Sequence, residues 1–176
     1  IEKISKIFIK HNLVLIEDAA EALGSEFKKK KLGSFDHITT FSFHIAKLIT
    51  TIEGGCVVSK NKKIIKKIEQ IKDHGRTSNE KYIHDAVGTN FRTTDLQSVL
   101  GVQQLKKIEK YIDKRNKVAL RYRKEIKNVQ FQEIPDFVTK HSYMLFFGKA
   151  DSENKRDEII EKCVKNGIDC RKTWMP

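Results

Sequence analysis

The sequence has little of what marks secreted, metal-binding or membrane-spanning proteins. It contains three cysteines, Cys56, Cys163 and Cys170, which form neither a CxxC pair nor a metal-like spacing. An odd number of widely separated cysteines is typical of reduced thiols, so we expect a cytoplasmic protein that holds no metal. Apolar runs such as residues 13–16 span only a few positions. Because a transmembrane helix needs about 20 apolar residues, we expect no membrane partner.

Acidic residues are also scarce, with 23 Asp and Glu against 35 Lys and Arg, which gives a net charge of +12. The lysines are spread along predicted helices and form no arginine-rich tail, and they do not interleave with aromatic residues as in RNA-binding domains. We therefore expect no nucleic-acid partner. A ligand rich in phosphate would suit the basic charge.

Strand-like and helical segments alternate along the chain, which predicts an α/β fold. Short apolar or β-branched runs predict strands at residues 13–17, 38–43, 55–59, 143–147 and 168–171. Helical spacing and capping residues predict helices at residues 1–11, 61–74, 93–127 and 154–166. The irregular stretch 75–92 is polar and long enough to be functional.

A change in composition at residues 128–140, which include Pro135, predicts a domain boundary. Residues 1–127 would form part of a large domain with a long helix leading out of it, and residues 128–176 an incomplete C-terminal domain. The chain opens on Ile1 inside a helical pattern. We therefore expect a piece of a longer protein.

Two segments combine residues that could carry chemistry. In the first, the apolar strand ending near Glu17 delivers Asp18 to its carboxyl end, where open α/β sheets bind ligands. In the second, Lys47 follows a strand, lies among apolar neighbours and precedes a glycine pair. A lysine amine becomes a nucleophile toward carbonyls when its pKa is lowered by desolvation or nearby positive charge. The hydroxyl of Ser42 is placed to hold a phosphate nearby.

Together these segments resemble the DegT/DnrJ/EryC1/StrS family of pyridoxal-phosphate-dependent nucleotide-sugar aminotransferases. Family members carry EDAA at the strand end and FSF…K…TT.EGG around the cofactor lysine, and this chain has EDAA at residues 17–20 and FSFHIAKLITTIEGG at residues 41–55. The resemblance continues through residues 87–97, 103–105 and 167–171. It therefore covers essentially the whole chain.

The resemblance implies an aspartate aminotransferase-like fold of type I with a mostly parallel sheet, and a start of a small α+β domain after residue 127. It also implies a homodimer with shared active sites and pyridoxal 5'-phosphate as cofactor. Lys47 would form the Schiff base with the cofactor and then move the proton between the substrate carbon and the cofactor carbon. Asp18 would pair with the pyridine nitrogen of the cofactor. Glu21 would lie beside the cofactor's phenolic oxygen, Ser42 would bind the phosphate, and Asn90 would reach the phosphate of the partner subunit's site. His141 and Tyr143 are candidates to border the substrate.

The expected reaction transfers an amino group, by family analogy from glutamate, to a nucleotide-linked 4-keto-6-deoxy sugar for surface polysaccharide, lipopolysaccharide or a related glycan. The Thr50–Gly55 sequence resembles members that aminate carbon 4. Amination at carbon 3 and the dehydrase branch of the family are alternatives, although the dehydrases have histidine in place of Lys47. From a different class, a non-catalytic regulator or nucleic-acid-binding protein could use the same fold. The family's upstream phosphate-binding loop and stacking aromatic precede the matched segments, so we expect this chain alone to be inactive.

Overall fold

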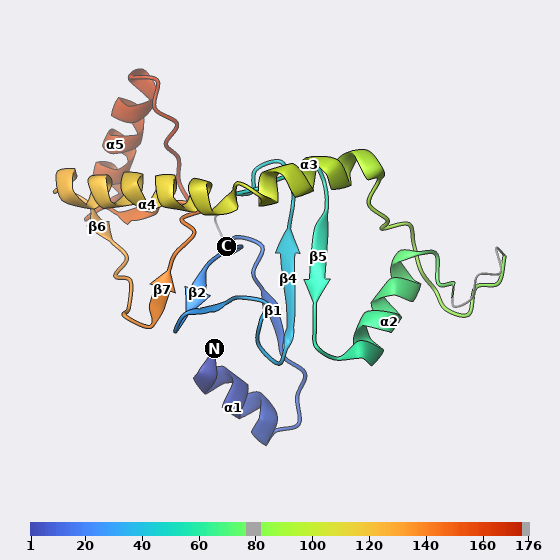
Figure 1. The fold of residues 1–176 in the computed structure, drawn as a ribbon. Coiled ribbons are helices and arrows are strands. Elements are labelled where there is room, and N and C mark those ends of the chain that lie inside the picture. Colours follow the sequence, from blue (N-terminus) through green and yellow to red (C-terminus); the bar gives the residue numbers. More distant parts are fainter. Residues whose placement is uncertain (77–81, 174–176) are drawn as a thin grey trace.

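A computed structural model describes residues 1–76 and 82–173 of the chain (Figure 1). The helices in this part are α1 (Glu2–Lys10), α2 (Lys62–Lys72), α3 (Asp95–Leu105), α4 (Ile108–Glu125) and α5 (Glu153–Lys165). The strands are β1 (Ile16–Asp18), β2 (Glu26–Phe27), β3 (Lys30–Lys31), β4 (Ile38–Ser42), β5 (Gly55–Val58), β6 (Gln130–Phe131), β7 (Val138–Lys140) and β8 (Gly148–Lys149).

The sheet that organises the first half has the strand order β1-β4-β5. Strand β4 runs parallel to β1, with Asp18 opposite Thr40, and antiparallel to β5, with Ser42 opposite Gly55. Thr39 and Phe41 of β4 are buried, as expected for a central strand. The sheet is thus mixed within the described residues, and the expected α/β arrangement is present.

Helices α3 and α4 follow one another as a nearly continuous rod that crosses the sheet (Figure 1). The core lies beneath this rod, where Leu48 and Ile49 pack against Ile108 and Ile112 of α4. Ile112 is completely buried. Gly24 approaches it so closely that an added Cβ would lie 2.4 Å from its Cδ1 atom. The packing of α4 therefore fixes the loop after β1 as well as the loop after β4.

The start of α2 was predicted at Asn61, and the start of α3 at Thr93 or Thr94, of which Thr94 is the cap. Asn61 caps α2 by accepting hydrogen bonds from the backbone N–H groups of Lys63 and Ile64. Thr94 caps α3 in a reciprocal capping box with Gln97. The single helix predicted for residues 93–127 is wrong in one respect, since it breaks at residues 106–107 into α3 and α4. The segment 168–171, predicted as a strand, is not a strand in the structure.

The strand predicted at residues 143–147 is also wrong, because only Gly148 and Lys149 pair there, with β6. Tyr143 instead adopts a positive φ of 44°. Its carbonyl and that of Met144 accept hydrogen bonds from the guanidinium of Arg115 on α4, at 2.9 and 2.7 Å. The guanidinium of Arg115, which is distant in sequence, thus binds the carbonyl groups that would otherwise pair with a neighbouring strand.

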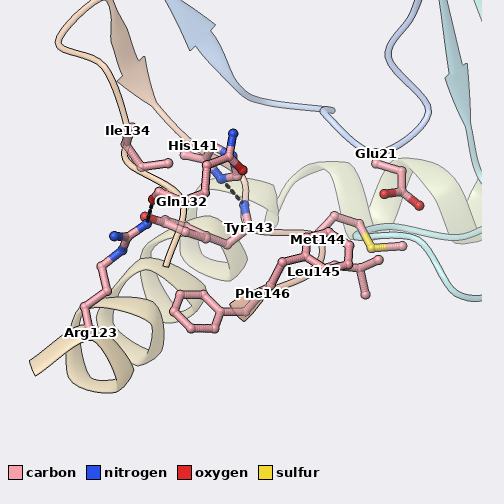
Figure 2. Close-up of a pocket in the computed structure, with 10 residues that line it drawn as sticks. Glu21, Arg123, Gln132, Ile134, His141, Tyr143, Met144, Leu145 and Phe146 are labelled. Atoms are coloured by element: carbon pink, nitrogen blue, oxygen red, sulfur yellow. Dashed lines mark hydrogen bonds between the residues drawn. The ribbon is translucent and has the colours of Figure 1, made fainter. Parts of the chain in front are cut away.

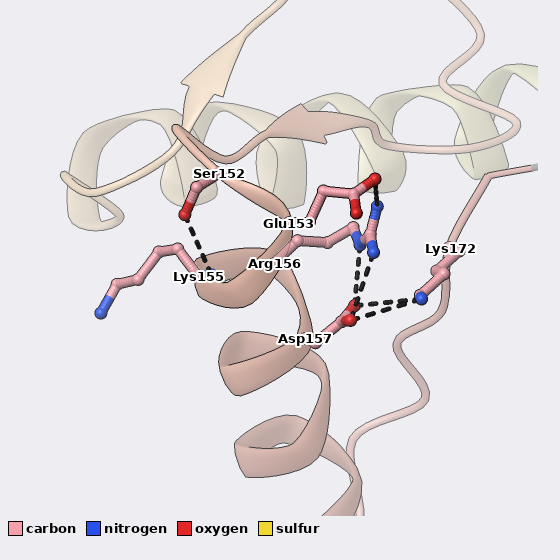
Figure 3. A network of polar contacts seen from close by, with 6 residues as sticks. All are labelled: Ser152, Glu153, Lys155, Arg156, Asp157 and Lys172. Carbon is pink, nitrogen blue, oxygen red and sulfur yellow. Dashed lines mark hydrogen bonds and ion pairs between the residues drawn. The ribbon is translucent and has the colours of Figure 1, made fainter.

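Strand β7 pairs with β2, so contacts cross the predicted domain boundary after residue 127. Helix α5 begins at its cap Ser152, and the segment after it turns back along the helix (Figure 3). Lys172 in this segment lies 3.2 Å from Asp157, which also accepts hydrogen bonds from Arg156. These exposed ion pairs lower the pKa of Asp157, first through Arg156 and then through Lys172.

Candidate functional site

Two polar residues end neighbouring parallel strands at the same edge of the sheet. Asp18 is the last residue of β1 and Ser42 the last residue of β4. Because the strands are parallel, the segments that follow them leave from one edge, where α/β sheets place ligands. The Oδ1 atom of Asp18 accepts a hydrogen bond from the backbone N–H of Ala20 at 3.0 Å, which orients the exposed carboxylate.

The segment between β4 and β5, residues 43–54, carries Lys47 and is called the Lys47 loop below. The backbone N–H of Lys47 donates to the carbonyl of His44 at 2.9 Å, and the hydroxyl oxygen of Ser42 accepts from the N–H of His44 at 3.3 Å. The side chain of Lys47 is only 18% exposed, and its Nζ atom lies 3.2 Å from Oε1 of Glu21. Since Glu21 follows Asp18 by three residues, the segments after β1 and β4 meet at this ion pair.

The end of the Lys47 loop is fixed by burial and by its own hydrogen bonds. Ile49 and Thr51 are only 3% and 5% exposed. The carbonyl of Phe43 accepts from the backbone N–H of Thr51 at 2.9 Å and from the hydroxyl of Thr50 at 3.0 Å. The packed residues 49–51 therefore fix the position of the loop that carries Lys47.

A pocket of about 180 Å³ opens beside Glu21 (Figure 2). Its lining comes from the loop after β1, from α4, from the segment between β6 and β7 and from the segment after β7: Glu21, Arg123, Gln132, Ile134, His141, Tyr143, Met144, Leu145, Phe146 and Phe147. His141 accepts a hydrogen bond from the N–H of Tyr143 at 3.0 Å, and burial lowers the pKa of its imidazole, with a smaller contribution from Arg123. His141 and Tyr143 thus lie in the wall of a pocket that reaches the partner of Lys47.

Buried polar residues that the sequence did not single out join the two sides of this pocket. Ser25 and Ser142 share a hydroxyl–hydroxyl bond at 3.0 Å, and the hydroxyl of Ser142 also donates to the carbonyl of Glu21 at 3.3 Å. Asn116 of α4 donates to the carbonyl of His141 at 2.9 Å. Single serines and asparagines far apart in sequence carry no local pattern, so no sequence signal pointed to them.

Asn90 lies in a different environment from Lys47. It forms an isolated β-bridge with Asp73 at the end of α2, and its side-chain oxygen accepts from the backbone N–H and the guanidinium of Arg92. Its side chain is exposed. The structure therefore gathers Asp18, Glu21, Ser42 and Lys47 at one edge of the sheet and attaches Asn90 to α2.

Residues 1–76 and 82–173 contain neither a metal-binding cluster nor a membrane-spanning helix. No group of three or more His, Cys, Asp or Glu side chains is placed to hold a metal ion there. No helix in the same residues is both long and apolar enough to cross a membrane. The three cysteines are half-buried and free of disulfides, and burial raises the pKa of the Cys56 thiol.

Two known proteins with similar sequences are nucleotide-sugar enzymes by name. The chain is 38% identical to UDP-4-amino-4,6-dideoxy-N-acetyl-beta-L-altrosamine transaminase of Campylobacter jejuni, over 99% of this chain and 48% of that protein. It is 36% identical to GDP-perosamine synthase of Vibrio cholerae, over 100% of this chain and 49% of that protein. The chain thus spans about half the length of these relatives.

Solved aminotransferase structures have the same fold as this chain. Helicobacter pylori PseC, an aminotransferase involved in pseudoaminic acid biosynthesis, superposes with a TM-score of 0.89 at 32% identity, over 99% of this chain and 49% of that chain. A Brucella abortus aminotransferase with 23% identity gives a TM-score of 0.86 over 94% of this chain and 44% of that one, which supports the fold alone. Such chains have the type I aminotransferase fold. A family model matches residues 1–176, and the chain belongs to the DegT/DnrJ/EryC1/StrS aminotransferase family.

Proposed function

We propose that this chain is part of an enzyme that transfers an amino group from glutamate to a nucleotide-linked 4-keto-6-deoxy sugar. The observation that carries the proposal is the shielded amine of Lys47, paired with Glu21 at the sheet edge where Asp18 and Ser42 end their strands. Family membership implies pyridoxal phosphate as the cofactor. The non-catalytic alternative has only the basic charge in its favour.

The residues at this edge supply the chemical groups that pyridoxal phosphate requires. An amine is needed to bond its aldehyde, and Lys47 provides one that lies largely out of solvent. An anion is needed beside its ring nitrogen, and Asp18 is a carboxylate at the strand end. A donor is needed for its phosphate, and the Ser42 hydroxyl accepts from His44 while its own hydrogen is left for another acceptor.

When bound, pyridoxal phosphate supplies an electron sink for the bond-breaking step at the substrate carbon. Lys47 would hold the cofactor and then, as a free amine, would move the proton between the substrate carbon and the cofactor carbon. Glu21, 3.2 Å from the lysine nitrogen, is the carboxylate placed to receive or return a proton at Nζ. Asp18 would stabilise the protonated ring nitrogen, and Asn90 would donate to the phosphate in the partner subunit's site, which would make the site a property of a homodimer.

The names of the relatives support the substrate class. A 4-amino-4,6-dideoxy sugar on a UDP carrier appears in the name of the Campylobacter enzyme, and perosamine on GDP in the name of the Vibrio enzyme. Lys47 in place of histidine argues against the dehydrase alternative, and the Thr50–Gly55 sequence argues for carbon 4 over carbon 3. We infer a cytoplasmic enzyme of surface-polysaccharide or lipopolysaccharide synthesis, with a domain boundary near residue 128.

Borohydride reduction of the full-length protein with bound cofactor, followed by peptide mapping, tests the central assignment. We expect the label on Lys47, and a label on Lys60 or Lys62 would contradict the proposal. Incubation with glutamate and a panel of nucleotide-linked 4-keto and 3-keto sugars then identifies the substrate. Amination of a 3-keto sugar alone would replace the carbon-4 assignment with the carbon-3 alternative.

A further inference from the structure

Helix α3 holds the Lys47 loop through the side chain of Gln104. The backbone N–H of Thr50 donates to Oε1 of Gln104 at 3.2 Å, and Nε2 of Gln104 donates to the carbonyl of Thr50 at 2.7 Å. A glutamine amide presents an acceptor and a donor side by side, so one side chain satisfies both backbone groups of Thr50. Thr50 follows Lys47 by three residues, and both of these hydrogen bonds are partly buried.

The same face of α3 makes two further contacts with the loop. Gly101 lies against Thr51 so closely that an added Cβ would lie 2.9 Å from the Thr51 methyl group. Gln97 donates to the carbonyl of Glu53 at 3.1 Å. Residues 97, 101 and 104 are four and three apart, so they share one helix face. Helix α3 thus touches the loop between Thr50 and Glu53.

The loop needs such support because its backbone is strained. Ile52, a β-branched residue, has a φ of +74°. Residues in sparsely populated backbone regions persist only when their surroundings fix them. The hydroxyl of Thr50 accepts from the N–H of Ile52 at 2.8 Å, so the residue that Gln104 binds is also the one that supports this strained position.

We propose that Gln104 is a positioning residue for the reaction: through Thr50 it fixes where the Lys47 amine lies relative to Glu21 and Asp18. The inference rests on the proposed function of Lys47. Gln104 does not touch the lysine itself, so its effect is geometric. A reacting group displaced by about 1 Å can lose roughly 100-fold in rate.

The test uses Gln104→Met in the full-length holoenzyme, because methionine keeps the length of the side chain and removes both hydrogen bonds. The matched control is Gln103→Met on the neighbouring, exposed residue. We expect kcat of Gln104→Met to fall by about 100-fold with little change in KM, and hydrogen exchange of the Thr50 amide to accelerate. A variant that loses Thr50 protection but keeps the wild-type kcat would overturn the proposal, as would a control with the same loss.

Gln104→Glu gives a readout that a purely structural role would not move. Only the neutral carboxylic acid can donate to the Thr50 carbonyl while accepting from its N–H. The activity of Gln104→Glu relative to wild type should therefore rise as the pH falls, whereas that of Gln104→Met should not. A ratio for Gln104→Glu that stays flat over the pH range in which the enzyme is stable contradicts the proposal.

A failure of the proposed function can be told apart from a failure of this inference. If the wild-type protein transfers no amino group, the proposed function fails. The rate at which Lys47 is labelled by pyridoxal phosphate and borohydride, read by peptide mapping, still decides the role of Gln104. Slower Lys47 labelling in Gln104→Met than in Gln103→Met supports positioning, and equal rates contradict it.

Discussion

The Lys47 loop and the segment of residues 82–94 around Asn90 are both irregular, but they are held in different ways. Side chains cover residues 48–51 of the Lys47 loop, where Ile49 is only 3% exposed, whereas Ile45 and Ile52 of the same loop are 64% and 55% exposed. The Asn90 segment is attached to α2 by its backbone, through bonds from the N–H of Thr89 to the carbonyl of Ile71 and from Phe91 to Lys72, each 2.9 Å long. Phe91 is nevertheless 71% exposed and Val87 97% exposed.

The difference indicates that the end of the Lys47 loop packs against its own chain, whereas the apolar side chains of the Asn90 segment are left uncovered by it. Residues 48–51 of the Lys47 loop are packed within this chain, against α3 and α4. The Asn90 segment is fixed in position but presents large apolar side chains outward, as surfaces that meet another surface do. This contrast supports the proposed role of Asn90 across a subunit boundary.

Removing the amine should have the largest effect. In the full-length enzyme, Lys47→Ala should abolish visible absorbance from covalently held cofactor and lower kcat by roughly 10⁴-fold or more, because both the bond and the proton transfer are lost. Absorbance spectra and steady-state rates measure this. The control Lys60→Ala changes an exposed lysine paired with Asp36 and should keep both. Wild-type turnover in Lys47→Ala would exclude the assignment.

Asp18→Asn should have the next largest effect. Asparagine keeps a side-chain oxygen to accept from the N–H of Ala20, so the loop after β1 should keep its conformation. A hydrogen bond to a charged group contributes about 1.5–3 kcal/mol, so kcat should fall by about 10- to 100-fold while the covalent link to Lys47 still forms. Steady-state kinetics with borohydride trapping checks both parts. Unchanged turnover would remove Asp18 from the mechanism.

Mixed dimers test whether Asn90 acts across the boundary. One subunit carries Asn90→Ala and the other Lys47→Ala, each of which is expected to be weakly active as a homodimer. If Asn90 serves the partner's site, one site of the mixed dimer holds both lesions and the other is intact. About half of the wild-type activity per mixed dimer should then return. Mixed dimers that form without any recovery would show that Asn90 serves its own chain.

A pair of glycine substitutions measures how firmly the Asn90 segment rests on α2. Gly75 has a φ of +77° and an added Cβ would lie 1.7 Å from the carbonyl oxygen of Ala86, whereas Gly167, with a φ of +75°, has no atom within 4 Å of that position. Both alanine variants carry the left-handed backbone cost of about 1–2 kcal/mol. Gly75→Ala should lose about 1–3 kcal/mol more through the clash.

Denaturant midpoints of the two variants give the comparison directly. Equal losses in Gly75→Ala and Gly167→Ala would mean that the segment around Ala86 does not pack on the end of α2 in solution. The Asn90 segment would then lack the fixed position on which the contrast with the Lys47 loop depends.

The smallest effect concerns the pocket wall beside the Lys47 loop. Burial lowers the pKa of His141, and the Arg123 charge adds to the shift, so the unfolded chain binds this proton more readily than the folded one. The free energy of unfolding should therefore fall as the pH drops below about 6.5, toward the lower folded pKa. His141→Gln should flatten that part of the stability profile. A wild-type slope retained in the variant would exclude His141 as its cause.

Features with short-range causes were predicted well from the sequence. The caps at Asn61 and Thr94 involve partners two or three residues away, so the sequence contains both sides of each interaction. The pattern of a strand followed by a polar residue or a lysine predicted chemistry around Asp18 and Lys47. The parallel pairing of β1 with β4 brings those strand ends to one edge of the sheet. The alternation of strands and helices likewise indicated the fold class.

Features decided by distant partners were missed. The conformation of residues 143–147 is fixed by Arg115, which lies 28 positions before Tyr143. The apolar character of these residues alone wrongly predicted a strand. The pairing of Lys47 with Glu21 and of Gln104 with Thr50 joins residues 26 and 54 positions apart. The sequence by itself determined the caps, the family and the residue types of the site. Only the tertiary structure decided which side chains meet, because the partners that satisfy a buried polar group are chosen by proximity in space.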